Sequence, residues 1–270
     1  MEKTVSGVDG GAERLFGALR GFERVAVGYS GGVDSALLLA AAVRAVGAEN
    51  TLAIIADSPS MPHGELADAL TLAKSLGAEC VVVRPGEIDD PEYAANPPDR
   101  CYICKRIIFK AIATAAAERG FGVVLDGENA DDAHDNRPGR RAVKEAGVRS
   151  PLAEAGFTKS EIRELSARWG LPTAQKPALA CLATRVPFGT KITAEILERI
   201  GRAEAALRVA GFGHCRVRHH VDVARIEVPA ERIAEIAAAG MRERVAEAVM
   251  AAGYKFVAVD LSGYKMGGLN

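Results

Sequence analysis

The 270-residue chain has no excess of basic residues and no apolar run long enough to cross a membrane. Its 34 Lys and Arg residues are balanced by 35 Asp and Glu residues, for a net charge of −1. A large nucleic-acid-binding surface normally needs a basic excess, so no nucleic-acid partner is expected. A single basic pocket for a small anion remains compatible with this balance. The Ala/Leu-rich run 36–43 is far too short to span a bilayer, and no membrane association is expected.

The chain also lacks targeting and disulfide signatures. No amino-terminal stretch combines a basic start, an apolar run and a cleavage site, so we expect a cytoplasmic protein. Five cysteines are an odd number, which favours ligand or redox roles over a disulfide framework. Residues 1–11 are polar and without periodicity, and this predicts a disordered amino terminus.

Short β-branched segments alternate with helical patterns in the first half of the chain. Strands are predicted at 24–28, 51–56, 79–83 and 122–126, and helices at 12–19, 33–46, 62–76 and 102–119. This alternation predicts an α/β fold, with a parallel sheet flanked by helices on both faces.

The pattern changes after a loop rich in Pro and Gly at 170–189. A helix at 193–209, a hairpin formed by 215–220 and 223–228, two Ala-rich helical stretches and a last strand at 255–260 follow. The sequence therefore predicts two domains, 12–184 and 185–270, of which the second is a smaller α+β domain.

The string Ser30-Gly-Gly-Val-Asp-Ser35 follows the first predicted strand and opens a helix. Glycines let the backbone approach phosphates, and the amides of a helix amino terminus attract an anion. The Ser hydroxyls add donors, and Asp34 can reach Mg²⁺ between phosphates. The Gly-Lys-Ser/Thr ending of the Walker loop is absent. The alternative is a glycine turn that merely starts a helix.

This string resembles the PP-loop of the ATP pyrophosphatase superfamily, which includes NAD and GMP synthetases and tRNA-thiolating enzymes. The resemblance implies adenylation of a substrate with release of pyrophosphate. It also assigns ATP binding to the residues Ser30, Gly31, Gly32, Val33, Asp34, Ser35, Asp57, Ser58 and Gly127.

Three cysteines, Cys101, Cys104 and Cys181, lie in loops or at a helix start. Three thiolates would leave a fourth position open on a tetrahedral metal or a cubane. Alternatives are helix-start packing, structural zinc with a fourth ligand that the sequence does not supply, and a dithiol pair that carries persulfide. Cys80 and Cys215 lie in apolar strand patterns and are expected to be core residues.

The strings Asn96-Pro-Pro-Asp-Arg-Cys-Tyr-Ile-Cys-Lys105 and Lys176-Pro-Ala-Leu-Ala-Cys-Leu-Ala-Thr-Arg185, together with the loop, resemble the LarE family. The resemblance extends over residues 12–265. Its members are ATP-dependent sulfur transferases that help to make the nickel-pincer nucleotide cofactor of lactate racemase. One departure is Ala174-Gln175, where members often carry Trp-Asp.

The resemblance implies that ATP adenylates a carboxylate of pyridinium-3,5-biscarboxylic acid mononucleotide and that sulfur then replaces AMP. In members with three cysteines, a [4Fe-4S] cluster held at the positions of Cys101, Cys104 and Cys181 is thought to carry the sulfide. Otherwise Cys181 is the sacrificial donor and becomes dehydroalanine. The cluster version is favoured here, with a sulfide or persulfide donor as partner and a homo-oligomer, a hexamer, as the expected assembly.

A phosphate-bearing substrate needs a cationic receptor. The strand period places Arg216, Arg218 and His220 on one face of a predicted strand, and two adjacent arginines suit phosphate recognition. Arg185 is a further candidate. The alternative is a solvated hairpin face. Likewise, Asp131 and Asp132 follow the fourth strand and either assist the metal or are solvated loop acids.

Two rival functions use some of the same features. A tRNA thiolase would also combine ATP with three cysteines, but the charge of −1 and the lack of a Lys/Arg-rich arm count against it. A non-catalytic cluster carrier would not need the intact 30–35 loop.

Overall fold

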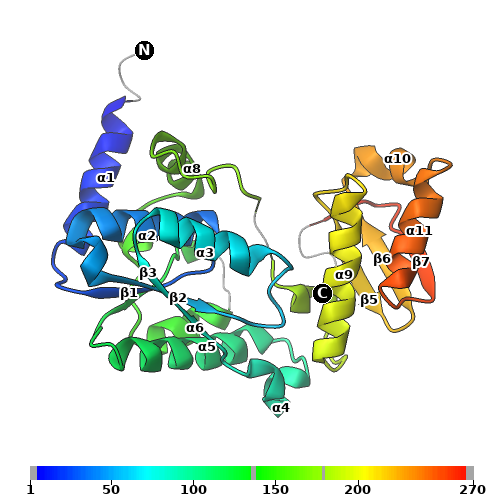
Figure 1. Ribbon diagram of the computed structural model, residues 1–270, viewed down its shortest axis with the longest axis horizontal. Helices are drawn as coiled ribbons and strands as arrows, with labels where there is room; N and C mark the ends of the chain where they lie inside the picture. Colours follow the sequence, from blue (N-terminus) through cyan, green and yellow to red (C-terminus); the bar gives the residue numbers. More distant parts are fainter. Residues whose placement is uncertain (1–4, 135–137, 178–179, 266–270) are drawn as a thin grey trace. The chain divides into compact units, whose positions relative to one another are not determined.

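The computed structural model describes residues 5–134, 138–177 and 180–265, which form an α/β fold (Figure 1). The strands are β1 Val25–Gly28, β2 Thr51–Ala56, β3 Glu79–Val83, β4 Val124–Leu125, β5 Arg216–His220, β6 Val223–Glu227 and β7 Phe256–Val259. The helices are α1 Val5–Leu19, α2 Val33–Val46, α3 Glu65–Ser75, α4 Pro91–Ala94, α5 Arg100–Ala117, α6 Pro138–Glu145, α7 Pro151–Glu154, α8 Lys159–Arg168, α9 Ala194–Val209, α10 Ile233–Ala237 and α11 Met241–Ala251. Short 3-10 turns include η3 Asp131–His134 and η4 Leu182–Arg185.

The chain divides into two compact units. The first comprises Met1–Ser58, Gly64–Glu87 and Asp99–Leu179, and the second comprises Pro59–His63, Ile88–Pro98 and Ala180–Asn270. The sequence placed one boundary near residue 185, whereas two short segments of the amino-terminal half belong to the second unit. Backbone hydrogen bonds explain this: Leu182 N donates to Ser60 O (2.7 Å) and Ile192 N donates to Ala94 O (2.8 Å).

The first unit contains the predicted parallel sheet, in the order β3-β2-β1-β4. Helices α2 and α3 cover one face of the sheet and α5 and α6 cover the other (Figure 1). Leu52 and Ile54 of β2 are fully buried and pack in one cluster with Phe109 and Ile112 of α5. Burying each such aliphatic side chain contributes about 1.5–3 kcal/mol. Because the strands are parallel, the segments that follow β1, β2 and β4 meet at one edge of the sheet.

Helix α1 corrects one expectation. Residues 1–11 were predicted to be disordered, but α1 begins at Val5; residues 1–4 lie outside the described part. The sequence signal was weak because glycines interrupt the helical period. Packing supplies the missing stabilisation: Leu15 and Leu19 are fully buried, and a Cβ on Gly11 would lie 3.2 Å from the Phe157 ring.

The second unit is built on the three-stranded sheet β5-β6-β7, in which β5 and β6 form the predicted antiparallel hairpin. Val221 takes up a left-handed φ of 55° at the turn. Val217 and Ile226 on one face of this sheet pack in a cluster with Leu207 of α9 and Val249 of α11.

A buried asparagine holds two loops of the second unit together. Asn96 is fully buried, and its Nδ2 donates to the carbonyl oxygens of Pro187 (2.8 Å), Thr190 (3.0 Å) and Val186 (3.3 Å). Its own carbonyl accepts from Gly189 N (3.0 Å). The segment before Cys101 and Cys104 is therefore hydrogen-bonded to residues 186–190, which follow Cys181.

Candidate functional site

The loop between β1 and α2 has the backbone that the sequence predicted. Gly31 has a φ of 72°, and a Cβ there would lie 2.7 Å from the Cβ of Ala69, so only glycine fits. Gly32 is the N-cap of α2, and no side chain caps it. The first amides of α2 thus remain available to an anion, with the positive end of the helix dipole behind them.

The two serines of this loop hold each other in place. The hydroxyls of Ser30 and Ser35 lie 3.1 Å apart, and Ser30 N donates to Ser35 Oγ (3.2 Å). Ser35 Oγ donates in turn to Gly32 O (3.3 Å). These internal hydrogen bonds therefore stabilise the conformation of the loop between β1 and α2.

Asp34 at the start of α2 contacts two residues to which the sequence assigned no role. Its Oδ2 accepts a bond from Lys159 Nζ, and its Oδ1 accepts from Asn129 Nδ2 (3.3 Å). Lys159 begins α8 behind Thr158, whose side chain and that of Glu161 form a capping box. The Thr-x-x-Glu pattern in the sequence could have placed this helix start, but not the distant contact with Asp34.

Gly127 follows β4 and presses against the start of α2. A Cβ at this position would lie 2.9 Å from Ser35 N and 3.2 Å from the carbonyl carbon of Asp34. Real Cβ atoms do not tolerate such contacts with backbone, so glycine is required for the two segments to meet. The predicted ATP residues Gly127, Asp34 and Ser35 thus lie together.

Asp57 and Ser58, which the resemblance placed at the adenosine, follow β2 at the same sheet edge. Asp57 Oδ2 accepts from Arg84 Nε (3.1 Å). The Arg84 side chain of this ion pair is largely exposed. Ser58 Oγ donates to Glu87 Oε1. Glu87 is fully buried, and its Oε2 has no hydrogen-bond partner within the described ranges.

Asp131 and Asp132 shape the segment after β4. Asn129 Oδ1 accepts from the backbone amides of both, at 3.0 and 3.3 Å, and Asp132 Oδ2 accepts from Asn129 N (3.2 Å). Asp131 Oδ2 accepts from Lys159 N (2.8 Å). Both acids therefore organise a turn and the start of α8, and a role in holding Mg²⁺ remains a prediction.

A second lysine, Lys176, contacts the loop between β1 and α2. It is the first residue of the segment 176–185, which contains Cys181. Lys176 Nζ contacts Glu65 Oε2 (2.6 Å) and donates to Gly31 O (3.3 Å). Two residues of this segment, at 178 and 179, lie outside the described ranges. No role was predicted for Lys176, although it stands in a string that carried the family resemblance.

Cys101 and Cys104 lie three residues apart in the first two turns of α5, on the same side of the helix. Cys101 is exposed and Cys104 is half-buried. The turn is held against α6: Tyr102 Oη donates to Glu145 Oε2 (2.7 Å), and the Arg141 guanidinium lies 3.9 Å from the Tyr102 ring centroid.

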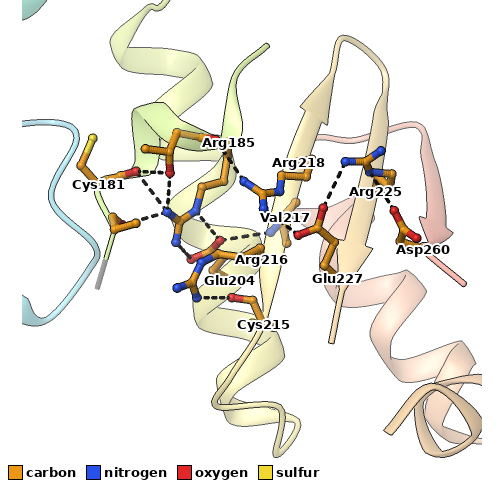
Figure 2. A network of polar contacts seen from close by, with 12 residues as sticks. Cys181, Arg185, Glu204, Cys215, Arg216, Val217, Arg218, Arg225, Glu227 and Asp260 are labelled. Atoms are coloured by element: carbon orange, nitrogen blue, oxygen red, sulfur yellow. Dashed lines mark hydrogen bonds and ion pairs between the residues drawn. The ribbon is translucent and has the colours of Figure 1, made fainter. Parts of the chain in front are cut away.

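Cys181 belongs to the second unit and immediately precedes η4. Its thiol is half-buried, and its carbonyl oxygen accepts from Arg185 Nη1 (3.1 Å) and from Thr184 Oγ1 (2.8 Å). Arg185 is 1% exposed and forms a two-point ion pair with Glu204 of α9 (Figure 2).

The arginines of β5 are buried too. Arg218 Nη2 donates to Glu227 Oε2 (2.7 Å) and Nη1 to Thr184 O (3.1 Å), whereas Nε has no acceptor among the residues that the structure describes. Arg216 Nη1 donates to Cys215 O (2.8 Å), and burial lowers the pKa of Arg216. Sequence periodicity found this shared face but missed Glu227, which pairs with Arg218 from the neighbouring strand β6.

Of the other two cysteines, both predicted to be core residues, Cys215 is buried, whereas Cys80 is only half-buried. Burial raises the pKa of the Cys215 thiol to about 12, with a further contribution from the nearby Glu204 carboxylate. Burial raises the pKa of the Cys80 thiol to about 11. Both thiols therefore stay protonated at neutral pH and are poor nucleophiles or metal ligands.

The three remaining thiols have the donor chemistry of an iron–sulfur site. In residues 5–134, 138–177 and 180–265, no three His, Cys, Asp or Glu side chains form a group that could hold a metal ion. Cys101 and Cys104 lie in the first unit and Cys181 in the second. A cluster on these thiols therefore remains a prediction from the donor set. Within the same ranges no helix is long and apolar enough to span a membrane.

The loop, the parallel sheet and Gly127 together define an ATP-using protein of the PP-loop class. In agreement, residues 18–94 match the NAD synthase family. The NH(3)-dependent NAD(+) synthetase of Methanococcoides burtonii is 44% identical over 63 residues, 23% of this chain and 24% of that protein.

Two relatives are similar over nearly their whole length. An uncharacterised protein of Synechocystis sp. is 42% identical over 257 residues, 95% of this chain and 94% of that protein. The pyridinium-3,5-bisthiocarboxylic acid mononucleotide synthase of Lactiplantibacillus plantarum is 36% identical over 256 residues, 95% of this chain and 92% of that protein. The chain belongs to the family of this synthase, the LarE family.

Proposed function

We propose that this protein is an ATP-dependent sulfur transferase that converts a carboxylate of pyridinium-3,5-biscarboxylic acid mononucleotide into a thiocarboxylate. The observation that carries the proposal is the Ser30–Ser35 loop at the start of α2, in a chain 36% identical over its length to a synthase named for the bisthiocarboxylic product. A carboxylate is a poor electrophile, and a mixed anhydride with AMP gives it a good leaving group.

In the first step, a substrate carboxylate oxygen attacks the α-phosphorus of ATP, and pyrophosphate leaves. The amides at the start of α2, with the hydroxyls of Ser30 and Ser35, bind the departing pyrophosphate. Asp34 is the residue that would hold Mg²⁺, which neutralises phosphate charge when bound. Lys159 contacts the Asp34 carboxylate, so it lies where it can compensate charge on the same loop.

In the second step, sulfide attacks the activated carbonyl carbon, the carbon–oxygen bond to AMP breaks, and the thiocarboxylate and AMP are released. Cys101, Cys104 and Cys181 are the residues that would hold a [4Fe-4S] cluster, which supplies the sulfide when bound. In the alternative route, the Cys181 thiolate attacks the activated carbon instead and AMP leaves, which gives a thioester. β-Elimination then removes the Cα proton to a base and breaks the Cβ–S bond, so that the thiocarboxylate is released and dehydroalanine remains at this position.

The arginines of β5 are proposed to bind the substrate phosphate. Together with Arg185 of η4, Arg216 and Arg218 carry three positive charges, whereas Glu204, which pairs with Arg185, and Glu227, which pairs with Arg218, carry two negative charges. The cluster therefore has a net positive charge in a buried environment, where attraction for an anion is strong. We also propose that the second unit provides the contacts of a homo-oligomer.

An ATP–pyrophosphate exchange assay tests the first step. Labelled pyrophosphate is expected to enter ATP only when the dicarboxylate mononucleotide is present. The variant Cys181→Ala is the matched control, since it keeps the ATP loop and is expected to exchange normally without forming thiocarboxylate. Absence of substrate-dependent exchange in the wild-type protein would reject the proposal.

Iron and acid-labile sulfide content of protein purified without oxygen tests the sulfur source. About four irons per chain, lost in Cys181→Ala, is expected for a cluster held by three cysteines. An iron-free protein that transfers sulfur and loses the mass of hydrogen sulfide at Cys181 would instead establish the sacrificial route.

A further inference from the structure

Arg185 uses all three of its nitrogens inside the chain. Nε and Nη2 donate to the two carboxylate oxygens of Glu204, at 2.9 and 3.2 Å. Nη1 lies within hydrogen-bond distance of Ala180 O (2.8 Å), Cys181 O (3.1 Å) and Thr184 Oγ1 (2.9 Å). With 1% of its surface exposed, the side chain lies between the Cys181 segment and α9, as Figure 2 shows.

These contacts hold the backbone on both sides of the Cys181 Cα. The Ala180 carbonyl belongs to the peptide that precedes Cys181, and the Cys181 carbonyl belongs to the peptide that follows it. The second carbonyl also accepts from Thr184 N (3.0 Å) and Thr184 Oγ1 (2.8 Å). Because the Cβ direction follows from the backbone on both sides of Cα, these bonds fix the direction in which the thiol leaves the chain.

The same contacts leave little of Arg185 for a substrate. An incoming phosphate would have to displace a two-point carboxylate from a buried guanidinium, which would leave Glu204 as an unpaired buried charge. Glu204 is itself anchored, since its Oε1 accepts from Val217 N of β5 (3.1 Å). The arginine thus connects the Cys181 segment to α9 and to the sheet of the second unit.

We infer that Arg185 is a positioning residue for the Cys181 thiol and not a ligand of the substrate phosphate. This inference rests on the proposed function, because it concerns how Cys181 meets the activated carboxylate or a bound cluster. It revises the sequence-based expectation for Arg185 and leaves Arg216 and Arg218 as the phosphate candidates.

The test uses variants that avoid a lone buried charge. The double variant R185M/E204Q removes both charges, approximately keeps the side-chain volumes, and retains an acceptor for Val217 N. The control is Arg225→Met, which removes a guanidinium from the same sheet. Arg225 pairs with Glu227 and Asp260, away from the ion pair between Arg185 and Glu204, and Glu227 keeps its partner Arg218 in this variant.

The first readout is the rate at which iodoacetamide alkylates Cys181 in the iron-free full chain, measured by peptide mass spectrometry with Cys101 as internal reference. Loss of the bonds from Arg185 frees the segment to open, and alkylation of Cys181 is expected to become about threefold faster or more in R185M/E204Q. Cys101 in the same protein, and Cys181 in R225M, are expected to react at the wild-type rate.

The second readout separates positioning from phosphate binding. A displaced thiol lowers kcat for thiocarboxylate formation by about tenfold or more, while KM for the mononucleotide stays within about twofold. A raised KM with unchanged kcat would show that Arg185 binds the substrate, and an unchanged Cys181 alkylation rate would show that it does not hold the segment. Either result overturns the inference.

Two further measurements keep the outcome unambiguous. If R185M/E204Q does not fold, Thr184→Val removes the hydroxyl that lies between Arg185 and the Cys181 carbonyl, and the same readouts apply in the same directions. Substrate-dependent ATP–pyrophosphate exchange is measured in parallel. Its absence from the wild-type protein would reject the proposed function, whereas the alkylation rates would still report on the Cys181 segment.

Discussion

Replacing Asn96 by alanine should destabilise the second unit strongly. The two Nδ2 protons of Asn96 serve three carbonyls, and the shortest bonds go to Pro187 O (2.8 Å) and Thr190 O (3.0 Å). The alanine variant loses the hydrogen bonds of both Nδ2 protons and leaves buried carbonyls without a donor. This loss should lower the free energy of unfolding by about 2–4 kcal/mol. This is a large part of the roughly 5–15 kcal/mol that stabilises a typical domain.

A matched variant isolates the backbone contribution. Asn96 has a φ of 56°, a conformation that asparagine tolerates and alanine does not. Glycine at this position removes the same hydrogen bonds without the strain. The free energy of unfolding of Asn96→Gly should therefore exceed that of Asn96→Ala by about 0.5–1 kcal/mol. This figure includes the cost of the greater conformational freedom of glycine in the unfolded chain.

Urea unfolding followed by circular dichroism measures both free energies. Hydrogen exchange of the amides of Gly189 and Ile192, which donate to Asn96 O and Ala94 O, localises the effect to the joined loops. Losses below about 1 kcal/mol in both variants would refute the hydrogen-bond reasoning. A glycine variant that is no more stable than the alanine variant would refute the strain reasoning.

Three other predictions follow from the packing and the pKa values. Gly127→Ala should abolish ATP binding measured by calorimetry, because its Cβ would meet Ser35 N at 2.9 Å; Gly122→Ala, with open space around its Cβ, should bind normally. The pKa of the Cys215 thiol is raised from 9.0 to about 12, so unfolding free energy should fall as pH rises from 9 towards 12, and the slope should decrease in Cys215→Ala. The pKa of His219 is lowered below 6.5, first by burial and then by the nearby Arg199 charge, so the unfolded chain takes up the proton first. Stability should therefore fall as pH drops below 6.5, less so in His219→Gln; a stability independent of pH between 5 and 7 would contradict this reading.

The sequence predicted the parallel sheet and the hairpin because both depend on local periodicity. The loop 30–35 was predictable for the same reason, since its glycines and serines are adjacent in the chain. Contacts between distant segments left no such pattern. The pairing of Asp34 with Lys159 joins residues that the fold alone brings together, as does that of Arg185 with Glu204.

The arginines of β5 show how a correct strand pattern can mislead about exposure. Alternation placed Arg216 and Arg218 on one face and suggested an open receptor, yet both are buried. Glu227, the carboxylate that pairs with Arg218, comes from the neighbouring strand β6, so a period of two along β5 could not reveal it. The sequence pattern likewise could not predict the role of the three cysteines, because Cys181 lies in a different compact unit from Cys101 and Cys104.

The most direct test of adenylation and sulfur transfer follows the carboxylate oxygens. The dicarboxylate mononucleotide is labelled with heavy oxygen in its carboxylates, and AMP and the pyridinium product are analysed by mass spectrometry after turnover with ATP. Attack of the carboxylate on the α-phosphorus predicts one heavy oxygen in AMP, and one oxygen replaced by sulfur in the product. Unlabelled AMP, or ADP in its place, would show that the carboxylate is not activated by adenylation and would contradict the proposed function.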